Sequence, residues 1–113
     1  MTIKKVCEKY NIQADSLRYY EQEGVIRDVP RVNGIRRYNE QNLKDTEFIL
    51  CMKRTGMIAS EIKDYMILFE QGDSTKEERR RMLLERKKKA ENSINELHDC
   101  VEYITEKLDR FYS

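Results

Sequence analysis

Three cysteines and one histidine are the side chains of this sequence best suited to nucleophilic or metal chemistry. Cys7, Cys51 and Cys100 lie far apart and form no CxxC pair, which argues against a zinc ribbon and a disulfide framework. His98 and Cys100 are two residues apart and would not share a helix face, so we expect no metal site and no cofactor. No histidine precedes His98 to activate either earlier thiol, and we therefore expect no enzyme.

Cys51 is the thiol with the most informative neighbours, because it lies in the apolar run Phe48 to Met52. The reactive form of a cysteine is the thiolate, which is a small fraction of a free thiol at neutral pH. On a helix, Arg54 would favour the thiolate and Glu47 would disfavour it. The residues alone leave open whether Cys51 is a reactive thiol or a packing residue.

Charged side chains are segregated along the chain although the net charge is only +1. Arg27 to Tyr38 contain four arginines and one acid, and Arg79 to Lys89 contain seven bases and one acid. The stretch from Glu91 to Asp109 is mostly acidic. This pattern indicates a polyanion partner at the front of the chain and an intermolecular contact at the back.

Composition narrows the class of protein. Charged residues make up 38% of the chain, and one proline and four glycines leave few turn signals, so a sandwich or barrel is not expected. The longest apolar runs are five residues, whereas a membrane span needs about 20. With no membrane segment and no signal peptide, we expect a cytoplasmic, predominantly helical protein.

The elements that position the basic stretch Arg27 to Tyr38 are predicted to form a helix-turn-helix with a wing. Helical periodicity runs over 3–10 and again over 14–23, with a break at 11–13 and a glycine cap at Gly24. A hairpin then follows, in which 29–32 and 35–38 flank Asn33-Gly34, the preferred dipeptide for a type I′ turn. Basic side chains on such a ribbon have no core to fill and are expected to face DNA phosphates.

Two further helices connect the wing to the rest of the chain. The first is predicted over 40–55, capped by Asn39, and its apolar run at 48–52 indicates that it is sandwiched between two packed surfaces. The second is predicted over 60–70. Its apolar face is expected to consist of Ile62, Tyr65, Met66 and Phe69.

The segment Thr75 to Tyr112 contains no glycine or proline and carries an unbroken heptad pattern. An exposed seam of this length would be unstable alone, so we expect a coiled-coil dimer. The alternative is a long helix folded back on its own domain. The predicted dimer interface consists of Leu83, Ala90, Ile94, Leu97, Val101, Ile104 and Leu108.

Three motifs in fixed order resemble the MerR family of transcription regulators: LRYYE at 17–21, GVI at 24–26 and GIRRY at 34–38. The resemblance implies a winged helix-turn-helix domain at 1–72 and an antiparallel dimerisation helix at 73–113. It also implies a homodimer on double-stranded promoter DNA with palindromic symmetry. The resemblance further implies that the dimer distorts an overlong spacer so that RNA polymerase can engage the promoter, which makes the polymerase an indirect partner.

Some candidate DNA contacts follow from helical geometry and others follow from the family resemblance. Helical geometry puts Arg18 and Tyr19 on the side of their helix opposite Leu17 and Tyr20, where they can reach bases or phosphates. The remaining candidates follow from the resemblance, with Tyr38 as a phosphate contact: Ser16, Arg36, Arg37 and Tyr38. The competing interpretation is a coiled-coil interaction module whose front domain binds protein.

The surroundings of Cys51 are similar to the MerR branch that responds to aldehydes and nitrosative stress, which implies that Cys51 is a sensing nucleophile. Modification there would overpack a close-packed site and shift the dimer. The alternative is a non-covalent effector with a structural Cys51. Met57-Ile58 stands where the family usually has a Ser or Thr helix cap. We expect neither the drug-binding domain that some members carry after the coil nor the cysteine pair of the metal-sensing members, and therefore no metal sensing. The inducer, the target genes and the choice between activation and repression are left open.

Overall fold

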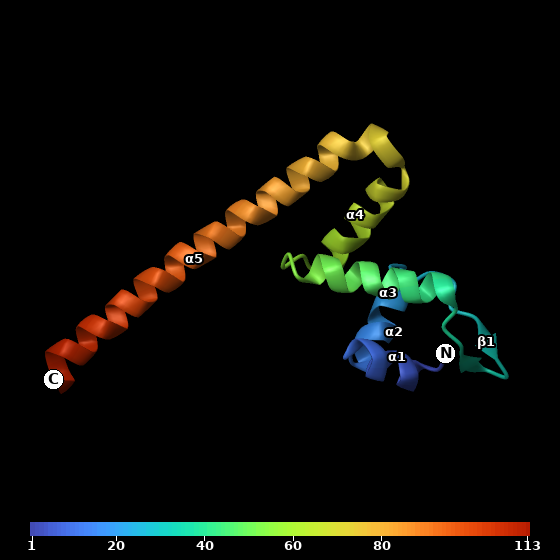
Figure 1. Cartoon of the computed structure of the whole chain (residues 1–113), viewed down its shortest axis with the longest axis horizontal. Helices are drawn as coiled ribbons and strands as arrows, with labels where there is room; N and C mark the ends of the chain where they lie inside the picture. The colour runs from blue at the N-terminus through green and yellow to red at the C-terminus, as the bar shows by residue number, and fades with distance from the viewer.

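The computed structural model describes residues 1–113 as a small helical head from which one long helix projects (Figure 1). The order of elements confirms the predicted all-helical class with a small β wing. In chain order they are α1 (Ile3–Tyr10), α2 (Ala14–Gln22), β1 (Arg31–Val32), β2 (Ile35–Arg36), α3 (Glu40–Lys53), α4 (Ala59–Glu70), the 3-10 turn η1 (Gly72–Thr75) and α5 (Lys76–Tyr112).

Local capping explains the bounds of α1, whereas α2 begins without a side-chain cap. The Thr2 hydroxyl accepts a hydrogen bond from the Lys5 amide at the start of α1, and Asn11 ends this helix in a left-handed conformation. Gln13 makes no side-chain cap at the start of α2, as its type predicts. α2 ends at Gln22, one residue before the predicted end.

The wing is shorter than predicted, although its turn is confirmed. Asn33 and Gly34 both have positive φ angles (53° and 77°), as a type I′ turn requires. Only Arg31–Arg36 and Val32–Ile35 pair in the antiparallel ladder. Tyr38 leaves the ladder because its amide donates to the Met1 carbonyl oxygen at 2.7 Å.

α3 and α4 begin in different ways. Asn39 and Asn42 each accept the other's backbone amide at 2.9 Å, which caps α3 on both sides. α4 begins at Ala59, where Ile58 has no side-chain acceptor and only the Glu61 carboxylate caps the Ile58 amide, at 3.1 Å. α3 ends at Lys53, two residues before the prediction.

The apolar core lies between α1, α2, the segment after α2, α3 and α4. Within α4, Ile62, Tyr65 and Met66 are buried as predicted, but Phe69 is 53% exposed and packs at the rim against Phe48, with ring centroids 5.8 Å apart. α5 has no buried residue. The fully buried apolar side chains are Val6, Leu17, Val25, Ile26, Ile49 and Ile62.

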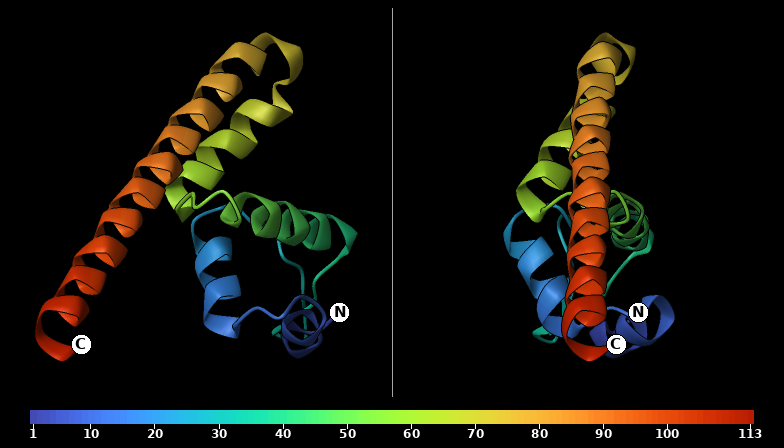
Figure 2. Two further views of the ribbon diagram at one scale, coloured as in Figure 1. Left: turned by 60° about the vertical axis from the view of Figure 1, so that its left-hand side comes forward. Right: turned by 90° about the vertical axis from the view of Figure 1, so that its left-hand side faces the viewer.

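α4 and the first turns of α5 lie side by side, and the remainder of α5 extends away from the head (Figure 2). The radius of gyration is 19.6 Å, compared with about 13 Å for a compact chain of this length. The structure therefore does not have the fold-back arrangement, in which the long helix packs on its own domain. None of its helices is long and apolar enough to cross a membrane.

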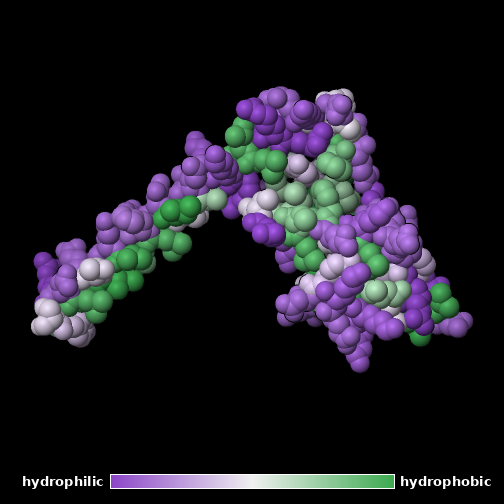
Figure 3. Space-filling model, in the orientation of Figure 1, coloured by the Kyte–Doolittle hydropathy of each residue, from purple (hydrophilic) through white to green (hydrophobic).

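The apolar seam of α5 is uncovered in the single chain. Figure 3 shows it as a continuous stripe along the projecting part of the helix. Ile94 and Leu97 are each 65% exposed and Val101 is 61% exposed. A helix that leaves such a stripe in water has the surface of one half of a coiled coil.

Candidate nucleic-acid interface

The outer face of α2 presents the two side chains that helical geometry predicted. Arg18 is exposed and Tyr19 is 49% exposed, whereas Leu17 and Tyr20 are buried beneath them. The Arg18 guanidinium donates to the Asp15 carboxylate one turn earlier at 2.8 Å, in a solvent-exposed pair. Such pairs are worth only about 0–1 kcal/mol, so Arg18 can exchange this partner for another anion.

Glu21 fastens the wing to α2. Its carboxylate accepts a 2.7 Å hydrogen bond from Arg36 Nε and a longer one of 3.4 Å from Arg31. The Glu21 side chain is only 18% exposed, so this contact is partly shielded from water. Sequence reasoning assigned no role to Glu21, although an acid one helical turn after Arg18 was a signal that could have been used.

Tyr38 lies in the core instead of on the predicted phosphate-contacting surface. It is 2% exposed, and its hydroxyl is buried without a hydrogen-bond partner. Burial raises the pKa of Tyr38, and the negative charge of Glu21 adds to this increase. Because side chains alternate along extended backbone, the exposed Arg37 points outward and Tyr38 points inward.

The predicted DNA contacts therefore fall into three groups. Arg18, Tyr19 and Arg37 are exposed and accessible. Ser16 and Arg36 are half-buried, and Arg36 is held by Glu21. Tyr38 alone is buried. The structure brings the wing next to α2 through Glu21. We call the arginines gathered there the basic surface, with the carboxylates of Asp15 and Glu21 lying among them: Arg18, Arg31, Arg36 and Arg37.

Cys51 is exposed, which corrects the expectation of a close-packed site. α3 buries one face, formed by Asn42, Asp45, Thr46 and Ile49. Cys51 lies two residues after Ile49 and therefore about 200° around the helix, toward solvent. The sandwich expected for 48–52 is only partial, and an added group at Cys51 would extend into water without overpacking the core.

The other thiols and the histidine show no shared site. Cys7 is half-buried and packs against the core. Cys100 is exposed on α5. His98 lies near the exposed carboxylates of Asp99 and Glu102, not near a thiol.

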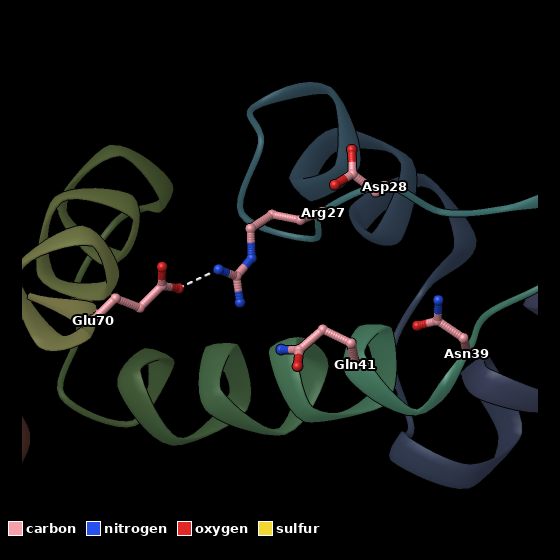
Figure 4. A pocket seen from close by; sticks show the side chains of 5 residues that line it. All are labelled: Arg27, Asp28, Asn39, Gln41 and Glu70. Carbon is pink, nitrogen blue, oxygen red and sulfur yellow. Dashed lines mark hydrogen bonds and ion pairs between the residues drawn. The ribbon is translucent and has the colours of Figure 1, made fainter.

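Arg27 is the centre of a polar network that the sequence did not reveal, here called the Arg27 hub. Figure 4 shows its side toward Glu70. The hub joins Arg27, in the segment after α2, to Asp45 and Asn42 of α3 and to Glu70 of α4. The guanidinium donates to Asp45 Oδ1 at 2.7 Å and also to the Glu70 carboxylate. The hydrogen bond to Asp45 is the main reason that the pKa of Arg27 is raised. An open polar hollow lies beside it, lined by Arg27, Asp28, Asn39, Gln41 and Glu70.

Comparison with known families gives two matches that together cover almost the whole chain. Residues 1–67 match the family described as MerR HTH family regulatory protein. Residues 44–106 match the family described as MerR, DNA binding. The sequence motifs at 17–21, 24–26 and 34–38 lie inside the first match.

Individual relatives agree with these matches. The chain is 38% identical over 90 residues to the HTH-type transcriptional regulator AdhR of Bacillus subtilis (strain 168), covering 79% of this chain and 64% of AdhR. It therefore spans less than two thirds of the length of that relative. It is also 33% identical to an uncharacterized HTH-type transcriptional regulator of Haemophilus influenzae, covering 95% of this chain and 80% of that protein.

Solved structures show the same architecture. HiNmlR, described as a MerR family regulator lacking the sensor domain and bound to promoter DNA, is 33% identical with a TM-score of 0.71. The match covers 96% of this chain and 86% of that one. A MerR family regulator from Bacillus thuringiensis is 28% identical with a TM-score of 0.70, covering 98% of both chains.

Proposed function

The chain belongs to the MerR family of DNA-binding transcriptional regulators, and from this premise we propose that it acts as a homodimer on a palindromic promoter element. The observation that carries the proposal is the basic surface in which Glu21 holds the wing beside α2. This contact fixes the spacing between the α2 side chains and the wing arginines before DNA arrives. Preorganised contacts of this kind reduce the entropy lost on binding.

We assign a proposed role at the DNA to each of these side chains from its exposure in the structure. Arg18 forks onto a guanine edge or a phosphate after leaving Asp15, and the Tyr19 hydroxyl reaches a phosphate. Ser16, Arg36 and Arg37 add contacts to the sugar-phosphate backbone. Tyr38 supports the wing from beneath.

The uncovered seam of α5 supports the dimer, and its charges support an antiparallel arrangement. Arg79 to Lys89 is strongly basic, and Glu91 to Asp109 carries six acids and one base. In a parallel pair, like-charged stretches would face each other. In an antiparallel pair, each basic stretch meets an acidic one. We retain 1–72 as the DNA-binding unit and 73–113 as the dimerisation unit.

In this scheme each head contacts one half-site and the coil sets the distance between the heads. Half-sites would lie about one helical turn, or a multiple of it, apart on one face of the duplex. RNA polymerase would respond to the resulting shape of the promoter, without a direct contact being required.

An electrophoretic mobility shift assay with the protein's own promoter region tests the proposal. We expect sequence-specific, salt-sensitive binding, because phosphate contacts release counterions. Arg18→Ala should abolish the shift and leave the dimer intact in sedimentation. Arg80→Ala is the matched control, because Arg80 forms the same kind of exposed pair one turn from Glu77. Unchanged DNA binding by Arg18→Ala would favour the protein-interaction alternative.

Cys51 carries a second, narrower proposal, that of an electrophile-responsive thiol. Its exposure makes it accessible to a small aldehyde or a related reagent. In a reporter assay, Cys51→Ser should bind the operator normally but fail to induce, while Cys7→Ser and Cys100→Ser remain inducible. If Cys51→Ser responds like the wild type, the effector binds elsewhere without covalent chemistry.

A further inference from the structure

We propose that the Arg27–Glu70 ion pair fixes the direction of the coil relative to the DNA-binding head and thereby selects the operator spacing. The head here comprises α1 to α3 with the wing, and the coil is α5. The inference rests on the proposed homodimer. It assigns a positioning role to two residues that lie away from the basic surface of α2 and the wing.

Arg27 is a fixed point of the head. Its backbone amide donates to Asp45 Oδ2 at 3.1 Å, and its backbone carbonyl oxygen accepts from Asn42 Nδ2 at 2.6 Å. The side chain of Asp45 is 3% exposed and Asn42 is fully buried, so both partners are immobile parts of α3. Two buried residues, Val25 and Ile26, precede Arg27. The guanidinium is therefore held from both its backbone and its side chain.

Glu70 is the last residue of α4, and its carboxylate accepts a hydrogen bond from the second terminal nitrogen of the same guanidinium. Figure 4 shows Arg27 reaching from the segment after α2 across to α4, with α3 alongside. The other contacts of α4 with the core that the structure describes are apolar. They come from Ile62, Tyr65 and Met66, with Ala59 and Phe69 at the edge. Apolar packing is non-directional, whereas a charged hydrogen bond has a preferred geometry. The pair therefore restrains the end of α4 nearest the turn into α5.

The turn between α4 and α5 transmits this restraint. The Thr75 hydroxyl lies 2.5 Å from the Leu68 carbonyl oxygen, and Arg79 donates to Thr75 at 3.0 Å and to the Gly72 carbonyl oxygen at 3.1 Å. Arg79 also lies over the Phe69 ring, 5.4 Å from its centroid. These contacts tie the end of α4 to the start of α5 across the turn.

The length of the coil amplifies small changes at this turn. α5 has 37 residues, which corresponds to roughly 55 Å at the rise of an α-helix. A tilt of about 5° at one end of such a helix displaces the other end by about 5 Å. Successive base pairs are about 3.4 Å apart along the duplex. Loss of the ion pair should therefore widen the range of distances between the two heads by more than the rise of one base pair.

The experiment measures affinity as a function of half-site spacing. The probes are an inverted-repeat duplex selected from a random library with the wild-type protein, the same duplex with one or two base pairs added or removed, and a single half-site. We expect wild type to discriminate against altered spacers. We define discrimination as the ratio of the affinity for the selected spacing to the affinity for an altered spacing. In Glu70→Gln this ratio should fall by about two- to fivefold, the range expected for an exposed ion pair. Glu70→Arg should lower it further.

Affinity for the single half-site should be unchanged in both variants, a result that general destabilisation would not give. Asp64→Asn is the matched control, because it removes the same charge from an exposed position of α4 without an ion pair. Full spacing discrimination in Glu70→Gln, or equal losses on the half-site and the full repeat, would overturn the inference. A wild-type protein that sediments as a monomer on either probe would instead refute the homodimer, and the proposed role of Arg27 with it.

Discussion

At the level of single residues, the Arg27–Asp45 pair differs from the other ion pairs because its carboxylate is buried, with the Asp45 side chain 3% exposed. Arg27→Met keeps the apolar stem but leaves Asp45 without a cation. Removing one partner of a buried pair costs about 3–5 kcal/mol, and because Arg27 is itself 35% exposed we expect about 2–3 kcal/mol. Urea unfolding measures this loss. The double variant Arg27→Met/Asp45→Asn should recover part of it, and a neutral effect of Arg27→Met would contradict the buried pair.

Tyr10 provides a second prediction at the level of single residues, which concerns the pH dependence of stability. Its hydroxyl donates to Glu47 Oε1 at 2.7 Å, and desolvation together with this carboxylate raises the pKa of Tyr10 from 10.0 to about 12. A raised folded-state pKa favours the protonated form, so its stabilising effect is complete below pH 10 and disappears as pH rises toward 12. Tyr10→Phe should remove this part of the alkaline loss of stability. A tyrosinate absorbance titration that finds every tyrosine ionising near its ordinary pKa would exclude the effect.

At the level of elements, α4 begins without a side-chain cap from its own N-cap residue. Ile58 has the extended backbone of an N-cap and is 64% exposed, so its replacement loses little packing. Ile58→Ser supplies the missing acceptor and should stabilise the protein by about 0.5–1 kcal/mol. Thermal unfolding tests this change. Ile58→Ala, which adds no acceptor, serves as the control and should give no comparable gain.

The elements also show how far the sequence could be used for prediction. Helix bounds were predicted to within about two residues because signals such as the break at Asn11 and the cap at Asn39 act within one helical turn. The burial of Tyr38 and the exposure of Cys51 were not predicted, since they depend on which face meets the core. The Arg27 hub joins residues 18 and 43 positions apart. No local pattern encodes such a contact, and the DNA contacts assigned to α2 and the wing stay predictions.

At the level of the whole molecule, the proposed homodimer depends on the seam of α5. Leu97→Glu with Val101→Glu would place unpaired carboxylates inside the coil, at a cost of several kcal/mol. We expect this double variant to be monomeric in sedimentation. Asn92→Glu with Asn95→Glu is the control, because it adds the same charge to outer positions of the heptad and should leave the dimer intact. If both double variants remain dimeric, the seam is not part of the dimer interface.

The absence of intramolecular support along residues 91–113, all of which are exposed, has a consequence for the turnover of the protein. In proteins most of the stability of a helix comes from tertiary packing, which this segment lacks within one chain. In the proposed homodimer the partner helix supplies that packing, so dilution should expose cleavage sites at Lys107 and Arg110. We expect limited trypsin digestion in this region to slow as protein concentration rises. A regulator built in this way would be degraded fastest when scarce, which sharpens the threshold at which it accumulates.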